Sequence, residues 1–431
     1  MLVKKVKGRQ LLDSRGNPTV EAELITPKGS FYAIVPSGAS TGEHEAVELR
    51  DKSKAFGGKG VLKAVKNINS NINKKIKGKN FSSIEELDSV LINLDGTANK
   101  KKLGANAILP VSLAFARALA YQNNMPLFEF IGKSYGNKKF NLPCIQSNVI
   151  NGGKHAASEN DIQEHMIMPL KFKNFGSALQ ATAETYHSLK KLLIKKYGAS
   201  SSLIADEGGF APKIFNTEER LNLIQKAISA AGYKNKIVFA LDAASSEFYN
   251  SRKNCYQLGK KSFSAEKLIE YYYKLTKNFP ILSIEDGLDE NDWLSWSVMN
   301  ETLGKKIQIV GDDLLTTNPE RIEFALQISA CNSLLLKVNQ IGTLTESLEA
   351  AVLAHESGWE VVVSHRSGET NDSFIADLAV GIGASQVKFG APARSDRNSK
   401  YNQLLRIEEY LSENNFKPEY QGNYLAKKFK L

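Results

Sequence analysis

Cysteine is scarce in this sequence: only three occur among 431 residues, far apart at Cys144, Cys255 and Cys331. An odd number of cysteines without a C-x-x-C pair argues against a disulfide scaffold and a zinc ribbon, and it suits a reducing compartment. No run of roughly 18 or more apolar residues is present, so we expect no membrane-spanning helix. The first residues, MLVKKVKGRQLLDSRG, lack the apolar core and cleavage site of a secretory signal. These absences together predict a cytoplasmic protein.

Length and composition are those of an enzyme-sized globular protein. The hydrophobic share is 42% and the charged share 24%, and the length allows a large domain plus a smaller one. The net charge of +10 raises the alternatives of nucleic acid or an anionic lipid surface as partners. The lysines are dispersed, however, and aromatic residues do not alternate with them. We therefore interpret the charge as solvated surface, so nucleic acid is not expected as the primary partner, and proteome bias is left open as the source of the charge.

The first 135 residues predict a small α+β domain. Three strand-like segments are separated by the turn sequences D-S-R-G-N-P and T-P-K-G-S, which favours an antiparallel meander. The strands are expected at 3–11, 19–26 and 30–36, and helices at 61–71, 83–92 and 106–122. A segment rich in Gly, Lys and Asn at 132–141 marks the boundary, so the predicted domains are 1–135 and 140–431.

Beyond this boundary, short β-rich runs alternate with helical stretches. The clearest runs are 237–242, 281–286, 307–313, 333–338, 360–365 and 385–390. The last five begin roughly 25 residues apart, which is the length of one strand, one helix and two loops. Two earlier segments, 144–151 and 162–168, bring the strands to eight. The pattern predicts a closed β/α barrel with parallel strands, although a doubly wound open sheet would give a similar repeat.

Ionisable residues stand at the end of each apolar run. They are three acidic residues followed by three basic ones: Asp242, Glu285, Asp312, Lys337, His365 and Lys388. In a barrel, the carboxyl ends of the strands converge on one mouth, where catalytic groups lie. The order of these six residues therefore predicts an active site at the mouth.

The residue types at these ends indicate the chemistry. A set of three carboxylates that includes no histidine or cysteine favours a hard cation, Mg²⁺ or Mn²⁺, over Zn²⁺. A lysine close to such a cation has a lowered pKa and can act as a base. Arg366 and Ser367, followed by a glycine, suit a phosphate. A cation, a lysine base and an anion clamp together predict removal of a proton next to a carboxylate.

Three glycine-rich segments are weaker signals. SGASTG at 37–42, NGGKH at 151–155 and DEGG at 206–209 could each close over a ligand or serve merely as turns.

At these residues the chain resembles the enolase (phosphopyruvate hydratase) family almost end to end. The resemblance is carried by LDSRGNPTVE, PSGASTGEHEAVELRD, LGANAIL, NGGKHA, DEGGFAP, GDDL, LKVNQIGTLTE, SHRSGET, FIADLAVG, GAPARSDR and NQLLRIEE, in the order that the family has them. It implies an enolase-type β/α barrel with an antiparallel start, preceded by a smaller α+β domain. It also implies reversible dehydration of 2-phosphoglycerate to phosphoenolpyruvate, a lyase reaction of glycolysis and gluconeogenesis.

The resemblance assigns roles residue by residue. Lys337 would be the base that takes the C2 proton, and Glu207 the acid that protonates the departing C3 hydroxyl. Two Mg²⁺ ions are implied, with Mn²⁺ as a substitute, and a lysine base beside Mg²⁺ is the known pattern of this superfamily. The first ion would be held by Asp242, Glu285 and Asp312, and the second would be joined by Ser40. The substrate contacts would be His155, Gln163, Glu164, His365, Arg366, Ser367 and Lys388.

Further expectations follow from the resemblance. A homodimer is implied, with an octamer left open, as is a secondary presence at the cell surface. Five positions depart from the family pattern and leave the rate, packing and pH dependence open: Gln146, Ser147, His165, Gly287 and Phe389.

Other readings remain. They are a racemase or cycloisomerase of the same superfamily, a non-catalytic descendant, and a protein associated with nucleic acid. The SGAST, DEGG and SHRSGET loops argue against the first, and the persistence of Glu207, Lys337 and the three carboxylates argues against the second.

Overall fold

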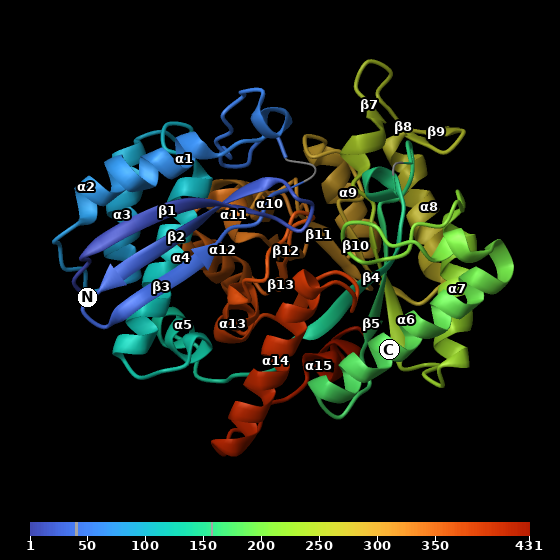
Figure 1. The fold of residues 1–431 in the computed structure, drawn as a ribbon. Helices are drawn as coiled ribbons and strands as arrows, with labels where there is room; N and C mark the ends of the chain where they lie inside the picture. Colours follow the sequence, from blue (N-terminus) through green and yellow to red (C-terminus); the bar gives the residue numbers. More distant parts are fainter. Residues whose placement is uncertain (39–41, 157) are drawn as a thin grey trace.

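The computed structural model describes residues 1–38, 42–156 and 158–431. Its N-terminal part is a three-stranded antiparallel sheet covered by helices (Figure 1). The strands are β1 (Lys5–Leu12), β2 (Pro18–Thr26) and β3 (Gly29–Ile34), and the helices are α1 (Leu62–Asn67), α2 (Asn73–Ile76), α3 (Ile84–Asp95), α4 (Ala105–Gln122) and α5 (Leu127–Tyr135). The predicted meander is confirmed. The first expected helix is longer than 61–71, because a π-helical turn η2 (Ile68–Ile72) joins α1 to α2, and η1 (Ala55–Gly58) precedes it.

Eight strands close into a barrel, which settles the choice between barrel and open sheet. They are β4 (Cys144–Asn151), β5 (Glu164–Pro169), β6 (Ile237–Asp242), β10 (Ile281–Glu285), β11 (Gln308–Gly311), β12 (Ser333–Leu336), β13 (Glu360–Ser364) and β14 (Gln386–Lys388). All residues of these strands are buried, as expected for parallel strands covered by helices on the outside. The barrel closes where β14 pairs with β4 in parallel.

One strand of the barrel runs against the others. β5 is antiparallel to both β4 and β6, and its first residue, Glu164, pairs with Asp242 at the end of β6. The amino-terminal end of β5 therefore lies at the barrel mouth, which brings Glu164 to the same level as the carboxyl ends of the other strands.

Helices surround the barrel (Figure 1). They are α6 (Phe175–Tyr197), α7 (Thr217–Ala230), α8 (Ala265–Asn278), α9 (Trp293–Leu303), α10 (Pro319–Gln327), α11 (Val338–Ile341), α12 (Leu344–Glu356), α13 (Phe374–Gly381), α14 (Ser395–Glu413) and α15 (Gln421–Lys428), with the short turns η3 (Gly153–Ala156), η4 (Ala199–Ser202) and η5 (Ser245–Phe248). A small sheet that the sequence did not predict, β7 (Tyr249–Asn250), β8 (Cys255–Leu258) and β9 (Lys261–Phe263), projects beside α8. In the described part of the chain, every helix is too short or too polar to cross a membrane.

A buried carboxylate joins the N-terminal helices to the barrel. The Oδ2 atom of Asp88, on α3, accepts hydrogen bonds from the Ser112 hydroxyl at 3.0 Å and from the backbone amide and hydroxyl of Thr345 at 3.0 and 2.7 Å. Burial raises the pKa of Asp88 from 3.8 to about 6. The folded protein therefore binds this proton more tightly than the unfolded chain does.

A pH dependence of stability follows from Asp88. A raised folded-state pKa gives stabilisation that is present below the ordinary pKa and is lost as the pH rises through about 6. The Asp88→Asn variant has no such proton. Between pH 5 and pH 8 we expect the wild type to lose about 1.4 kcal/mol of unfolding free energy relative to this variant, as measured by urea denaturation. Glu85→Gln, an exposed change on the same helix, is the control, and a pH-independent difference for Asp88→Asn would contradict the assignment.

Candidate active site

The predicted site residues meet at one cavity at the barrel mouth. The lining includes His155, Gln163, Glu164, Glu207, Asp242, Asp312, Lys337, His365, Arg366, Ser367 and Lys388. Glu285 lies beside this lining through its ion pair with Lys388. Ser40, the predicted ligand of a second ion, lies outside the described residues. Strand ends and loops therefore meet at the mouth, where they bring together residues that lie up to 233 positions apart in the sequence.

Lys388 is the centre of one half of the cavity. Its ammonium lies 2.9 Å from Asp242 Oδ2, 2.7 Å from Glu285 Oε1 and 3.4 Å from Glu164 Oε1. Burial would lower the pKa of Lys388, but the surrounding carboxylates outweigh it and raise that pKa well above its ordinary value. Lys388 is thus held as a cation, which suits binding of a negative group more than proton abstraction.

Lys337 is paired with Asp312 on the neighbouring strand end. Its ammonium donates to Asp312 Oδ2, and the amide of Gln340 donates to Asp312 Oδ1 at 2.8 Å. Burial would lower the pKa of Lys337, but Asp312 outweighs it, so that pKa is raised. The sequence led us to expect a lowered pKa for Lys337, but that lowering needs the positive charge of a cation close by. The side chains alone supply a carboxylate, which raises the pKa instead.

Two further carboxylates, which the sequence analysis did not select, adjoin Asp312. Asp286 accepts from the backbone amides of Asp312 at 2.9 Å and Asp313 at 2.8 Å, and its own backbone is left-handed with a φ of 44°. Burial raises the pKa of Asp286 and of Asp313 well above their ordinary values, and nearby carboxylates add to the effect. Asp286 therefore orients the start of the 312–313 loop from the adjacent strand.

The grouping of carboxylates bears on metal binding. Ligand atoms of Asp286, Asp312 and Asp313 lie within 4.8 Å of one another, as do those of His155, Glu164 and Glu207. Of the three predicted ligands of the first ion, only Asp312 is in a group found among the described residues, and the Lys388 ammonium contacts both Asp242 and Glu285. Burial raises the pKa of Glu285 well above its ordinary value, and Asp242 adds to the effect, which marks a surplus of buried negative charge. An all-oxygen site with such a surplus fits a divalent cation.

Glu207 faces two imidazoles. His155 Nε2 lies 3.7 Å from Glu207 Oε1, His365 Nε2 lies 3.5 Å from Oε2, and the Asn148 amide donates to Oε2 at 3.1 Å. Burial would raise the pKa of Glu207, but His155, the Nε2–H of His365 and the charge of Arg397 outweigh it and hold that pKa well below its ordinary value.

The pKa of Glu164 is shifted in the opposite direction to that of Glu207. Burial raises its pKa well above the ordinary value, and the charge of Glu207 adds to the effect. The family resemblance implies the proton on Glu207. The side chains by themselves instead favour it on Glu164, because His365 and Arg397 lower the pKa of Glu207, whereas the charge of Glu207 adds to burial at Glu164.

Arg366 carries a contact that the sequence did not reveal. Its two terminal nitrogens donate to Glu45 at 3.0 Å each, and one of them donates to Asn339 at 3.1 Å. Glu45 belongs to the N-terminal part of the chain, so a charged pair separated by 321 positions in the sequence completes the site. Both side chains are almost fully buried. The guanidinium that was predicted to hold a phosphate is therefore positioned by a carboxylate from the other half of the molecule.

Arg397, at the start of α14, ties two active-site loops together. It donates to the carbonyls of Arg366 at 2.5 Å, Ser367 at 2.6 Å and Asp206 at 3.1 Å, and to His365 Nδ1 at 2.6 Å. Because the guanidinium only donates, His365 Nδ1 must accept and the ring proton must lie on Nε2, which faces Glu207. Burial lowers the pKa of His365 to about 4, which keeps the ring neutral. The motif GAPARSDR contains Arg397, but nothing in its spacing marks it as a buried residue.

The five departures from the family pattern all lie in buried surroundings, and contacts account for four of them. The Gln146 amide donates to Gln386 Oε1 at 2.6 Å, and the Ser147 hydroxyl donates to the Gly390 carbonyl at 3.0 Å. Phe389 packs in the core against Tyr401, and burial lowers the pKa of His165 well below its ordinary value. A Cβ at Gly287 would lie 2.6 Å from the Met299 methyl, so Met299 occupies the space that a larger residue would need.

Comparison with known proteins covers nearly the whole chain. Residues 139–429 match the family described as enolase, C-terminal TIM barrel domain, and residues 3–131 match the enolase N-terminal domain. The enolase of Thermococcus gammatolerans is 53% identical over 408 residues, which is 94% of each chain. Enolase 1 of Entamoeba histolytica is 51% identical over 422 residues, covering 95% of this chain and 97% of its own. The enolase of Methanococcus aeolicus is 51% identical over 417 residues, 97% of this chain and 96% of its own.

Proposed function

The chain belongs to the enolase family, and its activity is that of a phosphopyruvate hydratase, a hydro-lyase; we propose that the cavity at the barrel mouth performs this reaction on 2-phosphoglycerate. The proposal rests on the ion pairs of two buried lysines at that cavity. Lys337 pairs with Asp312, and Lys388 pairs with Asp242 and Glu285. Such a charge arrangement suits a substrate with a phosphate and a carboxylate, and a reaction that adds a further negative charge.

In the proposed mechanism, Lys337 takes the proton from C2 as the neutral amine, the form that a divalent cation held close by would favour over the ammonium. Glu207 gives a proton to the departing C3 hydroxyl. Entry of the negatively charged substrate raises the pKa of the nearby carboxyl groups, which favours the protonated form of Glu207 that this step requires. His155 lies between these two carboxyls, 3.5 Å from Glu164 and 3.7 Å from Glu207.

The remaining groups orient the substrate. Arg366 and Ser367 would hold the phosphate, and Lys388 the carboxylate end. Gln163, which donates to Asp242 at 3.4 Å, and His365 would complete the pocket. These contacts would hold the C2 hydrogen near Lys337 and exclude water. Holding the reacting groups in this geometry is how substrate binding contributes to the rate.

A divalent cation is implied by the family, and we propose that it is Mg²⁺, two ions per site. Asp242, Glu285 and Asp312 would hold the first ion, Ser40 would join the second, and the surplus of buried negative charge described above supports this choice. When bound, Mg²⁺ would neutralise the substrate carboxylate and the charge that grows as the C2 proton leaves.

Chelation provides the test of this function. With Mg²⁺ present, the protein should form phosphoenolpyruvate, followed by its ultraviolet absorbance. After treatment with EDTA the rate should fall to background and return on adding Mg²⁺, and calorimetry should show Mg²⁺ binding that Asp242→Ala weakens. A folded, Mg²⁺-loaded protein without activity would contradict the catalytic function, whereas activity retained in EDTA would contradict only the metal assignment.

We further propose that residues 1–135 form the capping domain and 140–431 the catalytic barrel, that the protein is cytoplasmic, and that it is a homodimer. The family resemblance supports each of these, and sedimentation would distinguish a dimer from an octamer.

A further inference from the structure

The positive charge of the chain is concentrated in its N-terminal part. Residues 1–135 contain 21 lysines and arginines against 12 acidic residues, whereas residues 136–431 contain 35 against 34. A proteome biased toward lysine would leave both parts with an excess. The barrel part is nearly neutral, so the asymmetry needs an explanation specific to the N-terminal part.

Within this part, residues 52–84 contain nine lysines and no acidic residue. They are Lys52, Lys54, Lys59, Lys63, Lys66, Lys74, Lys75, Lys77 and Lys79, and all nine are exposed. Lys4, Lys5 and Lys7 are exposed beside them, because the backbone of Val3 is hydrogen-bonded to Gly78 and Lys79. We call these twelve residues the basic face. Within the described residues, no side chain of the basic face takes part in an ion pair or a side-chain hydrogen bond.

The π-helical turn aligns part of this face. Lys66 and Lys74 are eight residues apart, which in a regular α-helix would place them well out of phase. One turn of 3.6 residues plus one π turn of about 4.4 residues takes up eight residues, so the two lysines fall on the same side of the helical run. Lys63 lies one turn before Lys66 on that side. The break in the helix therefore keeps the lysines together.

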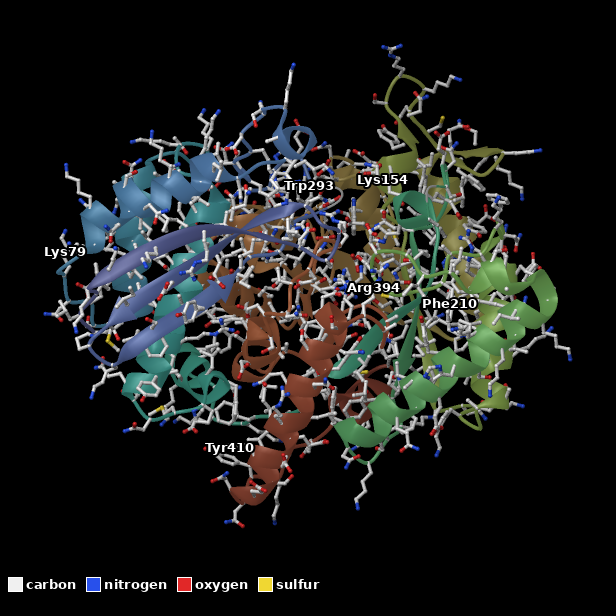
Figure 2. The ribbon with its side chains drawn as sticks, in the orientation of Figure 1. Lys79, Lys154, Phe210, Trp293, Arg394 and Tyr410 are labelled. Carbon is white, nitrogen blue, oxygen red and sulfur yellow. The ribbon has the colours of Figure 1, made fainter. Side chains whose placement is uncertain are left out.

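Two apolar side chains are exposed at one end of the basic face. Phe56 is 51% exposed at the tip of the 52–60 loop, and Leu62 is 59% exposed at the start of α1. Phe56 and Gly57 have φ angles of 50° and 61°, a tight turn that holds the phenyl ring away from the core. This loop projects above α1 (Figure 1), and Lys79 lies at the far left edge (Figure 2). The lysines therefore extend away from an apolar tip at one end of the basic face.

We propose that the basic face docks on the surface of a bilayer containing anionic lipids, with Phe56 and Leu62 entering the headgroup region. Unpaired ammonium groups match lipid phosphates and carboxylates, and the apolar tip matches the boundary of the acyl chains. Nucleic acid fits less well. Residues 52–84 contain no arginine, and Phe56 is the sole exposed aromatic residue among them, so groups that stack on or read bases are few.

Vesicle flotation with the full-length protein tests this proposal. Binding is expected to vesicles of phosphatidylcholine with 30% phosphatidylserine, to weaken as salt is raised, and to be absent from phosphatidylcholine alone. Each lysine near an anionic surface contributes roughly fivefold in affinity. The triple variant Lys63→Gln, Lys66→Gln, Lys74→Gln should therefore bind roughly 100-fold more weakly. Phe56→Asn, which suits the left-handed backbone, should weaken binding roughly tenfold.

The control is a triple variant with the same charge change on the exposed end of α6: Lys190→Gln, Lys191→Gln, Lys195→Gln. None of the substituted residues lines the active-site cavity, so the activity of every variant should match the wild type. Equal loss of binding in both triple variants, or no binding to anionic vesicles at low salt, would overturn the proposal. Binding to poly(U) RNA that exceeds vesicle binding at the same salt and is insensitive to Phe56→Asn would overturn the lipid assignment.

Discussion

Lys337→Ala is expected to stop exchange of the substrate's C2 proton with solvent and to lower kcat roughly 10⁴-fold. Alanine removes the ammonium that Lys337 contributes to the cavity from the end of β12, while Asp312 keeps its hydrogen bond from Gln340 at 2.8 Å. Exchange is measured in D₂O by NMR of the recovered 2-phosphoglycerate, so it reports proton removal even when dehydration is too slow to detect.

Lys100→Ala is the matched control for this experiment. Lys100 is also a buried lysine paired with a carboxylate, Glu346 at 2.8 Å, but it lies away from the cavity. Its loss should lower stability and leave the exchange rate per folded molecule unchanged. If exchange persisted in Lys337→Ala, a different group would have to be the base, and Lys388 would be the next candidate to replace.

Arg397→Met should lower kcat roughly 100-fold without removing any group that lines the cavity. Four hydrogen bonds to His365 and to the backbone of two loops disappear in this variant. Without the guanidinium, His365 Nδ1 has no donor, and the ring is free to move its proton from Nε2 to Nδ1. The KM for substrate should change less than kcat if the fault lies in the orientation of His365 and Glu207.

The tautomer can be observed directly. Nitrogen-15 NMR of the six histidines distinguishes protonated from unprotonated ring nitrogens, and the His365 signal is identified by its loss in His365→Gln. Wild type should show a protonated Nε2, and Arg397→Met should show a mixture. Arg117→Met, which removes a partly buried pair with Asp372, should leave the His365 signal unchanged. An unchanged signal in Arg397→Met would show that Arg397 acts through packing alone.

Sequence reasoning located the site through the ends of strands. Asp242, Glu285, Asp312, Lys337, His365 and Lys388 follow apolar runs, and strand ends must converge in a barrel, so local pattern and fold carry the same information. Glu164 follows a different rule, since it begins a strand. It reaches the mouth because β5 runs antiparallel to its neighbours, a feature that came from family resemblance and has no signature in the hydrophobic pattern.

Residues that act through distant partners were not found from the sequence. The pairing of Glu45 with Arg366 spans 321 positions, and that of Arg397 with His365 spans 32. A charged residue at such a position looks like any solvated one until the chain is folded, because charged side chains are seldom buried. The directions of the pKa shifts that the side chains alone give Lys337 and Glu207 depend on which charges face each group, so they too could not be predicted from the sequence.

The pairing of Glu45 with Arg366 limits how this molecule can be recombined. A chimaera that joined the barrel to the N-terminal half of an unrelated protein would keep every carboxylate and lysine of the mouth. It would still lack the acidic partner that aligns the guanidinium, and the buried positive charge would be left uncompensated. The loop around Glu45 therefore has to be kept together with the catalytic half in evolution and in protein engineering, although it precedes Arg366 by 321 positions in the sequence.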